Sequence, residues 1–459
     1  MTILSQNLEN EYLISKNIES FFKENSVGEI LTKSNARKEQ GIAVLRIFGA
    51  LLMLIFTGKS LNRLISENSF GFSKDTFYRF LNSVRINWQT FLSTLSSNVI
   101  QKILPLTSDT RINTLILDDT IFKRNRSKKV ELLARVQDHN DGRFYKGFRS
   151  LTAGFSDGNT FIPTGFNLLS SQNEKARINE AITKIDKRTN GYKRRLNAQI
   201  SMYDAAYELT KRAQNAKIPF SHVLFDSWFA MPVFFRTLLG LNVHGIGMLK
   251  STPKIFYYIG KKAFTLKVLH DLVSKKIPND KDKFSVKVTL KGNSEEKKVV
   301  CLKILFIHDI KAKNNWLAIG TTDLTLSDEQ IVTLYSRRWD IEVFFKTCKQ
   351  FLGFAKDFEG RNYDVLNAQV AISYTRYIML ATTVRKNTDM RTGGDLFYAI
   401  YDELRENSLS QAMLIFLEYL NLSLQKFFAD STINNFQTYF FASLPCFIKD
   451  LLHFPRCES

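Results

Sequence analysis

Two short apolar runs, each followed directly by aspartate, constrain the fold of this chain more than any other feature. Residues 114–117 (TLIL) precede Asp118 and Asp119, and residues 222–225 (HVLF) precede Asp226. A continuous apolar run of this length is typical of a strand buried on both faces, as in an α/β protein. Carboxylates at the ends of neighbouring strands meet at the sheet rim, where ligands bind. A single aspartate after a strand is also common simply because Asp starts turns.

A polar stripe lies on a helix predicted over residues 327–352. Its members are Tyr335, Arg338, Glu342 and Lys349, with Lys346 beside them. Offsets of 3, 7 and 14 from the first member place these side chains within roughly 60° of one another, at about 100° per residue. Much of the remaining helix is apolar, so the stripe is expected to face a site. The alternative is a row of surface ion pairs, worth only about 0.3–0.5 kcal/mol each.

Two strand-end aspartates and one helix glutamate together suit a pair of divalent cations. Carboxylate oxygens are hard ligands that favour Mg²⁺ or Mn²⁺. Two such ions stabilise the entering and leaving oxygens at a phosphorus atom. Arginine and lysine beside the glutamate would then grip backbone phosphates, arginine through a bidentate fork.

The charge of the chain favours an anionic partner. Sixty-four Lys and Arg oppose 44 Asp and Glu, a net charge of +20. This field attracts phosphate backbones or anionic membrane surfaces, although a generally basic proteome would also produce it. The longest apolar run, residues 47–56, is too short to span a bilayer, which needs about 20 residues. No secretory signal is visible at the N-terminus, so a cytoplasmic location is expected. The scattered cysteines and histidines indicate neither a disulfide framework nor a zinc site.

The predicted elements change in character along the chain. Residues 1–107 read as helical, and two short helices at 60–65 and 73–81 resemble a helix-turn-helix, although any helical hairpin looks similar. Strand-like and helical segments then alternate, with a hairpin turn at residues 157–159. Residues 173–216 read as a polar helical stretch. A strand-rich segment and further helices follow.

The polar stripe also carries a family resemblance. Its Y-x2-R-x3-E-x6-K spacing matches the Y-R-E-K signature of DDE transposases of the insertion-sequence-four type. Residues 117–120 (LDDT) and 225–229 (FDSWF) resemble the first and second aspartate motifs of that family. The resemblance covers about residues 110–385. It implies an α/β fold with an RNase H-like catalytic core, interrupted by a β-rich insertion.

The resemblance also implies an organisation and a set of roles. The expected regions are a helical DNA-binding region (1–107), the first part of the core (108–250), the insertion (251–323), the second part of the core with the glutamate helix (324–385) and a C-terminal helical region (386–459). Asp119, Asp226 and Glu342 are the expected metal-binding catalytic triad. Asp119 is preferred to Asp118 because the family has Asp followed by Thr, and adjacent strand residues point to opposite faces.

DNA contacts are expected outside the triad. The resemblance implies that Tyr335, Arg338 and Lys349 contact phosphates near the transposon end, with Lys346 beside them. Trp316 and Trp339 are candidates for contacts with a flipped base. The alternative is that both are core tryptophans, and it is slightly favoured for Trp339.

These inferences predict a cut-and-paste transposase. Two Mg²⁺ ions, with Mn²⁺ as a substitute, would serve cleavage and strand transfer at insertion-sequence ends. The expected partners are double-stranded DNA, as terminal inverted repeats and target, and a second copy of the chain in a synaptic dimer. A bacterial cytoplasm, with association to the nucleoid on binding DNA, is the expected location. The alternatives are another nuclease of the same fold, such as a resolvase or integrase, and a non-catalytic DNA-binding protein derived from a transposase.

Overall fold

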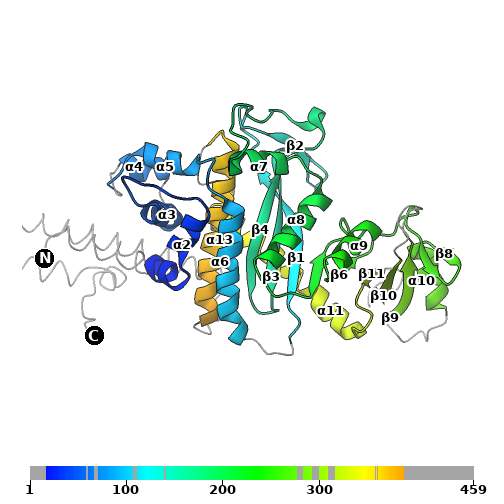
Figure 1. Ribbon diagram of the computed structural model, residues 1–459. Helices are drawn as coiled ribbons and strands as arrows, with labels where there is room; N and C mark the ends of the chain where they lie inside the picture. The colour runs from blue at the N-terminus through cyan, green and yellow to red at the C-terminus, as the bar shows by residue number, and fades with distance from the viewer. Residues whose placement is uncertain are drawn as a thin grey trace, which may run out of the picture.

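The computed structural model places a mixed sheet at the centre of the molecule, between N-terminal helices and a strand-rich end (Figure 1). It describes residues 17–386. The segments left out within that range are 58–59, 67–70, 107–110, 139–140, 276–282, 292–298, 309–315, 357 and 359. The C-terminal helical region expected over 386–459 therefore lies almost wholly outside the described residues.

The core strands follow the order β4-β3-β1-β5-β6. Their bounds are β1 (Thr114–Lys123), β3 (Phe144–Ser156), β4 (Phe161–Leu169), β5 (His222–Phe225) and β6 (His244–Met248). β2 (Ala134–Gln137) pairs with the start of β3, on the edge away from β1. β3 pairs antiparallel with β1 and β4, whereas β5 runs parallel to β1 and β6. This arrangement confirms the expected α/β fold with an RNase H-like core.

The apolar runs became strands because both of their faces are covered. Residues 115–117 and 223–225 are fully buried. The hairpin between β3 and β4 turns at residues 157–159 as predicted. Gly158 takes φ +88°, a conformation that favours glycine, and the Arg337 guanidinium leaves no room there for a Cβ.

Helices from both ends of the described chain cover the core. The N-terminal helices are α2 (Val27–Lys33), α3 (Val44–Met53), α4 (Leu61–Ser66), α5 (Lys74–Leu81) and α6 (Trp88–Ile103), with 3-10 turns η1 (Leu54–Thr57) and η2 (Leu104–Leu106). α4 and α5 confirm the two short helices predicted there. α6 contacts β4 and lies beside α13 (Tyr363–Lys386), as Figure 1 shows. No helix in the described part of the chain is long and apolar enough to cross a membrane.

Arg376 joins the two groups of helices inside the protein. This α13 side chain is fully buried. It donates hydrogen bonds to the carbonyl oxygens of Leu51 and Leu52 in the last turn of α3, and to that of Leu352. A cation at a helix C-terminus also complements the helix dipole. The N-terminal helices are therefore tied to the last described helix of the chain.

The polar stretch predicted as helical over 173–216 is only partly so. It contains a 3-10 turn η3 (Glu174–Ala176), a loop, and then α7 (Asn190–Asn197) and α8 (Met202–Asn215), whose N-caps Thr189 and Ser201 accept from backbone N–H groups. α8 packs on β3 and β4. α9 (Pro232–Gly240) follows β5.

The strand-rich segment extends the core sheet. It contains α10 (Leu266–Ser274) and β7 (Tyr257–Ile259), β8 (Lys262–Phe264), β9 (Lys283–Leu290), β10 (Val300–His308) and β11 (Trp316–Thr321). β11 pairs antiparallel with β6, with Ile319 opposite Met248, so the hydrogen-bonded ladder is continuous. α11 (Asp328–Ser336) and α12 (Trp339–Gln350) then return the chain to the core.

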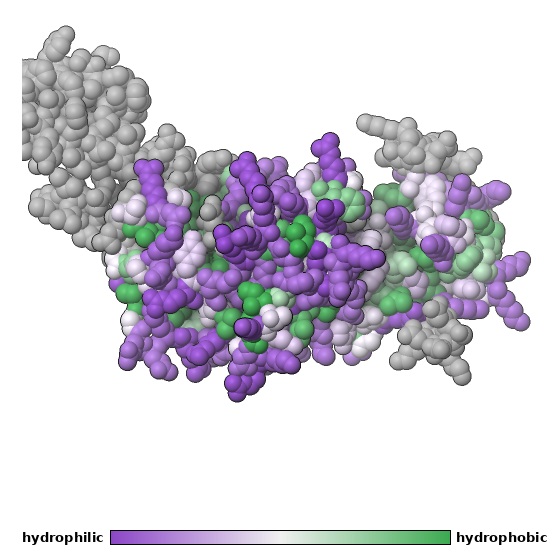
Figure 2. Space-filling model, turned by 90° about the horizontal axis from the view of Figure 1, so that it is seen from above, coloured by the Kyte–Doolittle hydropathy of each residue, from purple (hydrophilic) through white to green (hydrophobic). Residues whose placement is uncertain are grey.

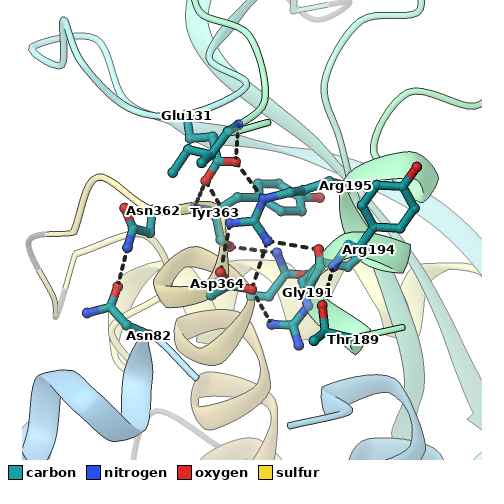
Figure 3. Close-up of polar contacts among 12 residues, drawn as sticks. Asn82, Glu131, Thr189, Gly191, Arg194, Arg195, Asn362, Tyr363 and Asp364 are labelled. Carbon is teal, nitrogen blue, oxygen red and sulfur yellow. Dashed lines mark hydrogen bonds and ion pairs between the residues drawn. The ribbon is translucent and has the colours of Figure 1, made fainter. Parts of the chain in front are cut away.

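A buried ion network lies where α7, α13 and the loop before β2 meet (Figure 3). Arg195 of α7 makes two hydrogen bonds to the Glu131 carboxylate and two to that of Asp364 at the start of α13. Arg194 lies 3.1 Å from Asp364. The backbone N–H of Tyr363 also donates to Glu131. In this network two cations balance two carboxylates.

The surface over the middle of the molecule is polar. Seen from above, it is covered mainly by hydrophilic residues, with hydrophobic ones in small separate patches (Figure 2). Scattered exposed apolar residues of this kind are ordinary for a globular protein.

Candidate active site

Asp118 and Asp119 lie within β1, which corrects the expectation that this strand ends at them. β1 continues to Lys123 because its second half stays paired with β3, with Ile121 opposite Arg149. Asp226 does follow the end of β5, as predicted. β1 and β5 are parallel, with Ile116 opposite Leu224, so two residues further on Asp118 and Asp226 are level.

Helix α12 brings Glu342 to the aspartates by packing against β1. Arg338, at the N-terminus of this helix, bridges the two elements. Its Nη1 lies 3.1 Å from Oδ2 of Asp118, and its Nη2 lies 2.5 Å from Oε1 of Glu342. Asp118 and Glu342 therefore share one guanidinium.

Asp119 takes a different partner. Nη1 of Arg149, on the neighbouring strand β3, lies 2.6 Å from its Oδ2. Nη2 of Arg149 donates to the carbonyl of Gln137. Sequence reasoning missed Arg149, because only the register between β1 and β3 brings it to the aspartate.

Negative charge is concentrated at this point of the sheet. Burial raises the pKa of Asp118 to about 7, and the charges of Asp119 and Asp226 act in the same direction. Burial also raises the pKa of Asp226, with Asp119 the next largest cause. Electrostatic repulsion therefore acts among the carboxylates of Asp118, Asp119 and Asp226, and the Arg338 guanidinium offsets part of it.

The polar stripe is carried by two helices instead of the single helix predicted over 327–352. α11 ends at Ser336 and α12 begins at Trp339. The side chains nevertheless converge. Burial raises the pKa of Tyr335 to about 12, with Arg338 lowering it and Asp226 raising it further. The hydroxyl of Tyr335 therefore faces the same charged groups as Arg338.

Lys349 lies near the C-terminal end of α12, exposed but within electrostatic range of the carboxylates. Removal of its ammonium from water lowers its pKa, as does the charge of Lys123, whereas Asp138, Asp119 and Asp118 raise it. Lys346 lies one turn earlier, exposed to solvent.

The carboxylate oxygens of this site are the kind of ligand that a hard divalent cation prefers. Four carboxylates gather here, those of Asp118, Asp119, Asp226 and Glu342, and Mg²⁺ prefers such oxygen ligands. Within the described residues, no three His, Cys, Asp or Glu side chains are arranged to enclose a metal ion. The guanidinium groups of Arg338 and Arg149 occupy carboxylate oxygens in this conformation. Metal binding would replace these contacts.

Comparison with known proteins gives a family. Residues 27–258, half of the chain, match the family described as DDE superfamily endonuclease. The chain belongs to the DDE superfamily endonucleases. Residues 176–359 also match the family described as archaeal putative transposase ISC1217. This confirms the superfamily part of the expected resemblance, and the insertion-sequence-four grouping stays a prediction.

Other comparisons are more distant. No curated protein matches this DDE superfamily chain. Among solved structures, a piggyBac transposase synaptic complex with hairpin DNA matches with 14% identity and a TM-score of 0.41. That match covers 96% of this chain and 85% of the other.

The two candidate tryptophans of this DDE endonuclease lie in different surroundings. Trp316 stacks on His270 of α10, with ring centroids 4.3 Å apart, so it packs within the strand-rich segment. Trp339 is 64% exposed, which makes the slightly favoured core interpretation wrong for this residue. Trp228, two residues after Asp226, is also exposed. It belongs to the second aspartate motif, yet its exposure could not be predicted from the local pattern.

Proposed function

We propose that this DDE endonuclease is a transposase that cuts and rejoins DNA at the ends of an insertion sequence. The proposal is carried by one convergence: Asp118 and Glu342 share Arg338, and Asp119 and Asp226 lie within electrostatic range of the same groups. The family matches support it, since one of them is described as a transposase. The grouping with the insertion-sequence-four type rests on the Y-R-E-K spacing.

Asp119, Asp226 and Glu342 would hold two Mg²⁺ ions, for which Mn²⁺ could substitute. When bound, such ions activate water and stabilise charge on the oxygens at phosphorus. Asp119 is proposed over Asp118 because Thr120 follows it, as in the first aspartate motif of the family that the chain resembles. Asp118 is then a positioning residue that holds Arg338 through their ion pair.

Cationic and polar groups around the triad would position the DNA. Arg338 can present its fork to a phosphate once Glu342 turns to a metal ion. Lys349 and Lys346 would hold phosphates further along α12, and Tyr335 would donate its phenolic hydrogen, because its raised pKa keeps it protonated. Trp316, with its ring stacked on His270, is proposed to contact DNA from the strand-rich segment.

The remaining parts of the chain take proposed roles by the same resemblance. Residues 1–107 would bind terminal inverted repeats, and residues 386–459 would support dimer contacts in a synaptic complex. Residues 108–250 and 324–385 would form the catalytic core, with 251–323 as its insertion. The enzyme would act in a bacterial cytoplasm, at the nucleoid.

The decisive experiment is cleavage of labelled duplex DNA that carries the ends of the chain's own element. Wild-type protein with Mg²⁺ should release the cut strand, and EDTA or Glu342→Gln should abolish release. A matched pair, Asp118→Asn and Asp119→Asn, assigns the first ligand. Asp119→Asn should abolish cleavage with Mg²⁺ at any concentration, whereas Asp118→Asn should weaken DNA binding and leave slow cleavage.

A non-catalytic DNA-binding protein is the second candidate. The contacts of Arg338 and Arg149 with the carboxylates favour it, because they leave no preformed metal cage in the described residues. Binding of the element's ends with no strand cut under either Mg²⁺ or Mn²⁺ would support this candidate and overturn the enzyme.

A further inference from the structure

A wide basic cleft lies beyond the end of β1, outside the carboxylate site. It has a volume of about 1040 Å³. The loop after β1 forms one wall and the segment between α12 and α13 forms the other. Its basic lining residues are Lys123, Arg124, Arg126, Lys128, Lys129, Lys356 and Arg361. We call this feature the basic cleft. It exceeds the usual 300–1,000 Å³ range of small-molecule pockets.

Hydrogen bonds across the basic cleft hold its two walls together. Arg124 donates to the carbonyl of Ala355 and, over 2.7 Å, to Oε1 of Gln369. The backbone N–H of Glu131 donates to the carbonyl of Arg361 over 2.8 Å. Glu131 is itself fixed by Arg195 in the buried ion network of Figure 3. The cleft is therefore formed before any ligand arrives, which lowers the entropic cost of binding.

None of the described lining residues of the basic cleft is acidic. Of its cations, Lys123 pairs with a carboxylate beside the lining, Asp138, at 3.5 Å. Asp357 and Glu359 of the same segment lie outside the described residues. Arg126, Lys128 and Lys129 are exposed, and no ion pair involves them in the described part of the chain. A row of unpaired cations on a braced loop favours a polyanion.

The basic cleft continues from the carboxylate site along one strand. Lys123, at its near end, is four residues after Asp119 on β1, roughly 13 Å at the usual strand rise. Lys349 is within electrostatic range of both residues, since the charge of Lys123 lowers its pKa and that of Asp119 raises it. Positive side chains thus lead from the carboxylates into the cleft.

We propose that the basic cleft binds the phosphate backbone of the DNA segment that leads away from the carboxylate site. The proposal deepens the proposed function and rests on it for the identity of the polyanion. Lysine and arginine dominate the described lining, and Phe358 is its one described aromatic residue and is buried. Contacts of this kind neutralise phosphates and carry no sequence information. Binding there is therefore independent of sequence.

The test measures binding of a fluorescent 40-base-pair duplex of arbitrary sequence to the full chain in EDTA, across a series of NaCl concentrations. The variant is Arg126→Gln/Lys128→Gln/Lys129→Gln. Removing one phosphate-neutralising cation should flatten the plot of log affinity against log salt by about 0.9, so the slope of the triple variant should be shallower by up to roughly 2.7. Its affinity at 100 mM salt should fall at least about tenfold.

A matched control removes three exposed lysines from the strand-rich segment, Lys261→Gln/Lys262→Gln/Lys267→Gln. It changes the net charge equally, so it should leave the salt slope within about 0.5 of wild type. Equal reductions in the two variants would mean that only net charge matters, and would overturn the proposal. An unchanged slope in the cleft variant would overturn it as well.

A second measurement on wild-type protein does not depend on a variant folding. Acetylation of lysines by a small amine-reactive acetylating reagent, read by mass spectrometry, should show DNA protecting Lys128 and Lys129 and leaving Lys261 reactive. Equal labelling with and without DNA contradicts the proposal. Because these tests contain no metal, failure to cleave DNA would overturn the proposed enzyme and leave the basic cleft standing.

Discussion

Two groups of acidic side chains in this protein are held by arginine, and they differ in balance. In the buried ion network, Glu131 and Asp364 face Arg194 and Arg195. Burial alone would lower the pKa of Arg195, but hydrogen bonds to Asp364 and Glu131 raise it above its usual value. Every charge there has a partner, as expected of a group that serves the fold.

The carboxylate site has the opposite balance. Three of its four carboxylates pair with guanidinium groups, Asp118 and Glu342 with Arg338 and Asp119 with Arg149, and burial raises the pKa of Asp118 to about 7. Perturbed acids of this kind gather at functional sites. The comparison teaches that surplus charge, more than burial or the presence of arginine, separates a site from a structural brace.

The largest effect should come from replacing an aspartate of the carboxylate site. Asp226→Asn is expected to reduce the DNA cleavage rate at least about 1000-fold, because it removes a proposed metal ligand. Its melting temperature should be unchanged or higher, since the substitution relieves repulsion with Asp119. Cleavage of end-bearing DNA, followed beside thermal melting, measures both. Cleavage within tenfold of wild type would remove Asp226 from the site.

The structural network should fail in the complementary way. Asp364→Asn is expected to lower the free energy of unfolding by about 3 kcal/mol or more, because the buried Arg194 loses its counter-charge and Arg195 keeps only that of Glu131. Urea denaturation followed by tryptophan fluorescence measures it. Glu180→Gln is the control, since that side chain is 62% exposed in its pair with Arg177 and should change stability by less than about 1 kcal/mol. Similar decreases in both variants would contradict the comparison.

The two groups should also respond differently to pH. The pKa of Asp118 in the folded chain is about 7, above the ordinary value of 3.8, so the folded state binds more protons in between. Stability should therefore fall as pH rises from 5 to 7 in metal-free buffer, by about 2 kcal/mol. Asp118→Asn should flatten this dependence and Glu131→Gln should not. If the stability of the wild-type protein rises over this range, the inference that surplus negative charge raises the pKa of Asp118 is wrong.

The smallest expected effect is that of magnesium on stability. At a Mg²⁺ concentration ten times its dissociation constant, the folded state should gain about 1.4 kcal/mol. Thermal melting with and without EDTA measures the gain. It should vanish in Asp226→Asn and persist in Asp364→Asn, measured relative to each variant without metal. Equal gains in the two variants would place the ion elsewhere.

Local patterns sufficed for the strands that carry the aspartates. The runs at 114–117 and 222–225 are strands, as predicted. Apolar and polar residues need not alternate in a strand when both faces of the sheet are covered. The end of β1 was not predictable in the same way. Asp118 and Asp119 look like a turn, yet pairing with β3 holds the strand extended to Lys123. Register across strands outweighed the local preference.

The helix that carries Glu342 shows the same limit. The 3.6-residue spacing brought Arg338 and Glu342 to one face, and their ion pair has that spacing. Nothing local indicates the break after Ser336, where there is neither Gly nor Pro. At the break Arg337 turns to the carbonyl of Ile112, a tertiary contact. The ion pairs of Arg149 and Arg195 could not be predicted either, because their acidic partners are distant in sequence.

The bonds of Arg376 to the last turn of α3 give the molecule a fixed order of assembly. Residues near position 50 leave the ribosome long before residue 376, so the first helices of the nascent chain lack the Arg376 contact until α13 emerges. Completion of the amino-terminal part thus depends on synthesis of almost the whole central sheet. A gene fragment truncated ahead of α13 would yield a chain whose earliest helices stay open to proteases.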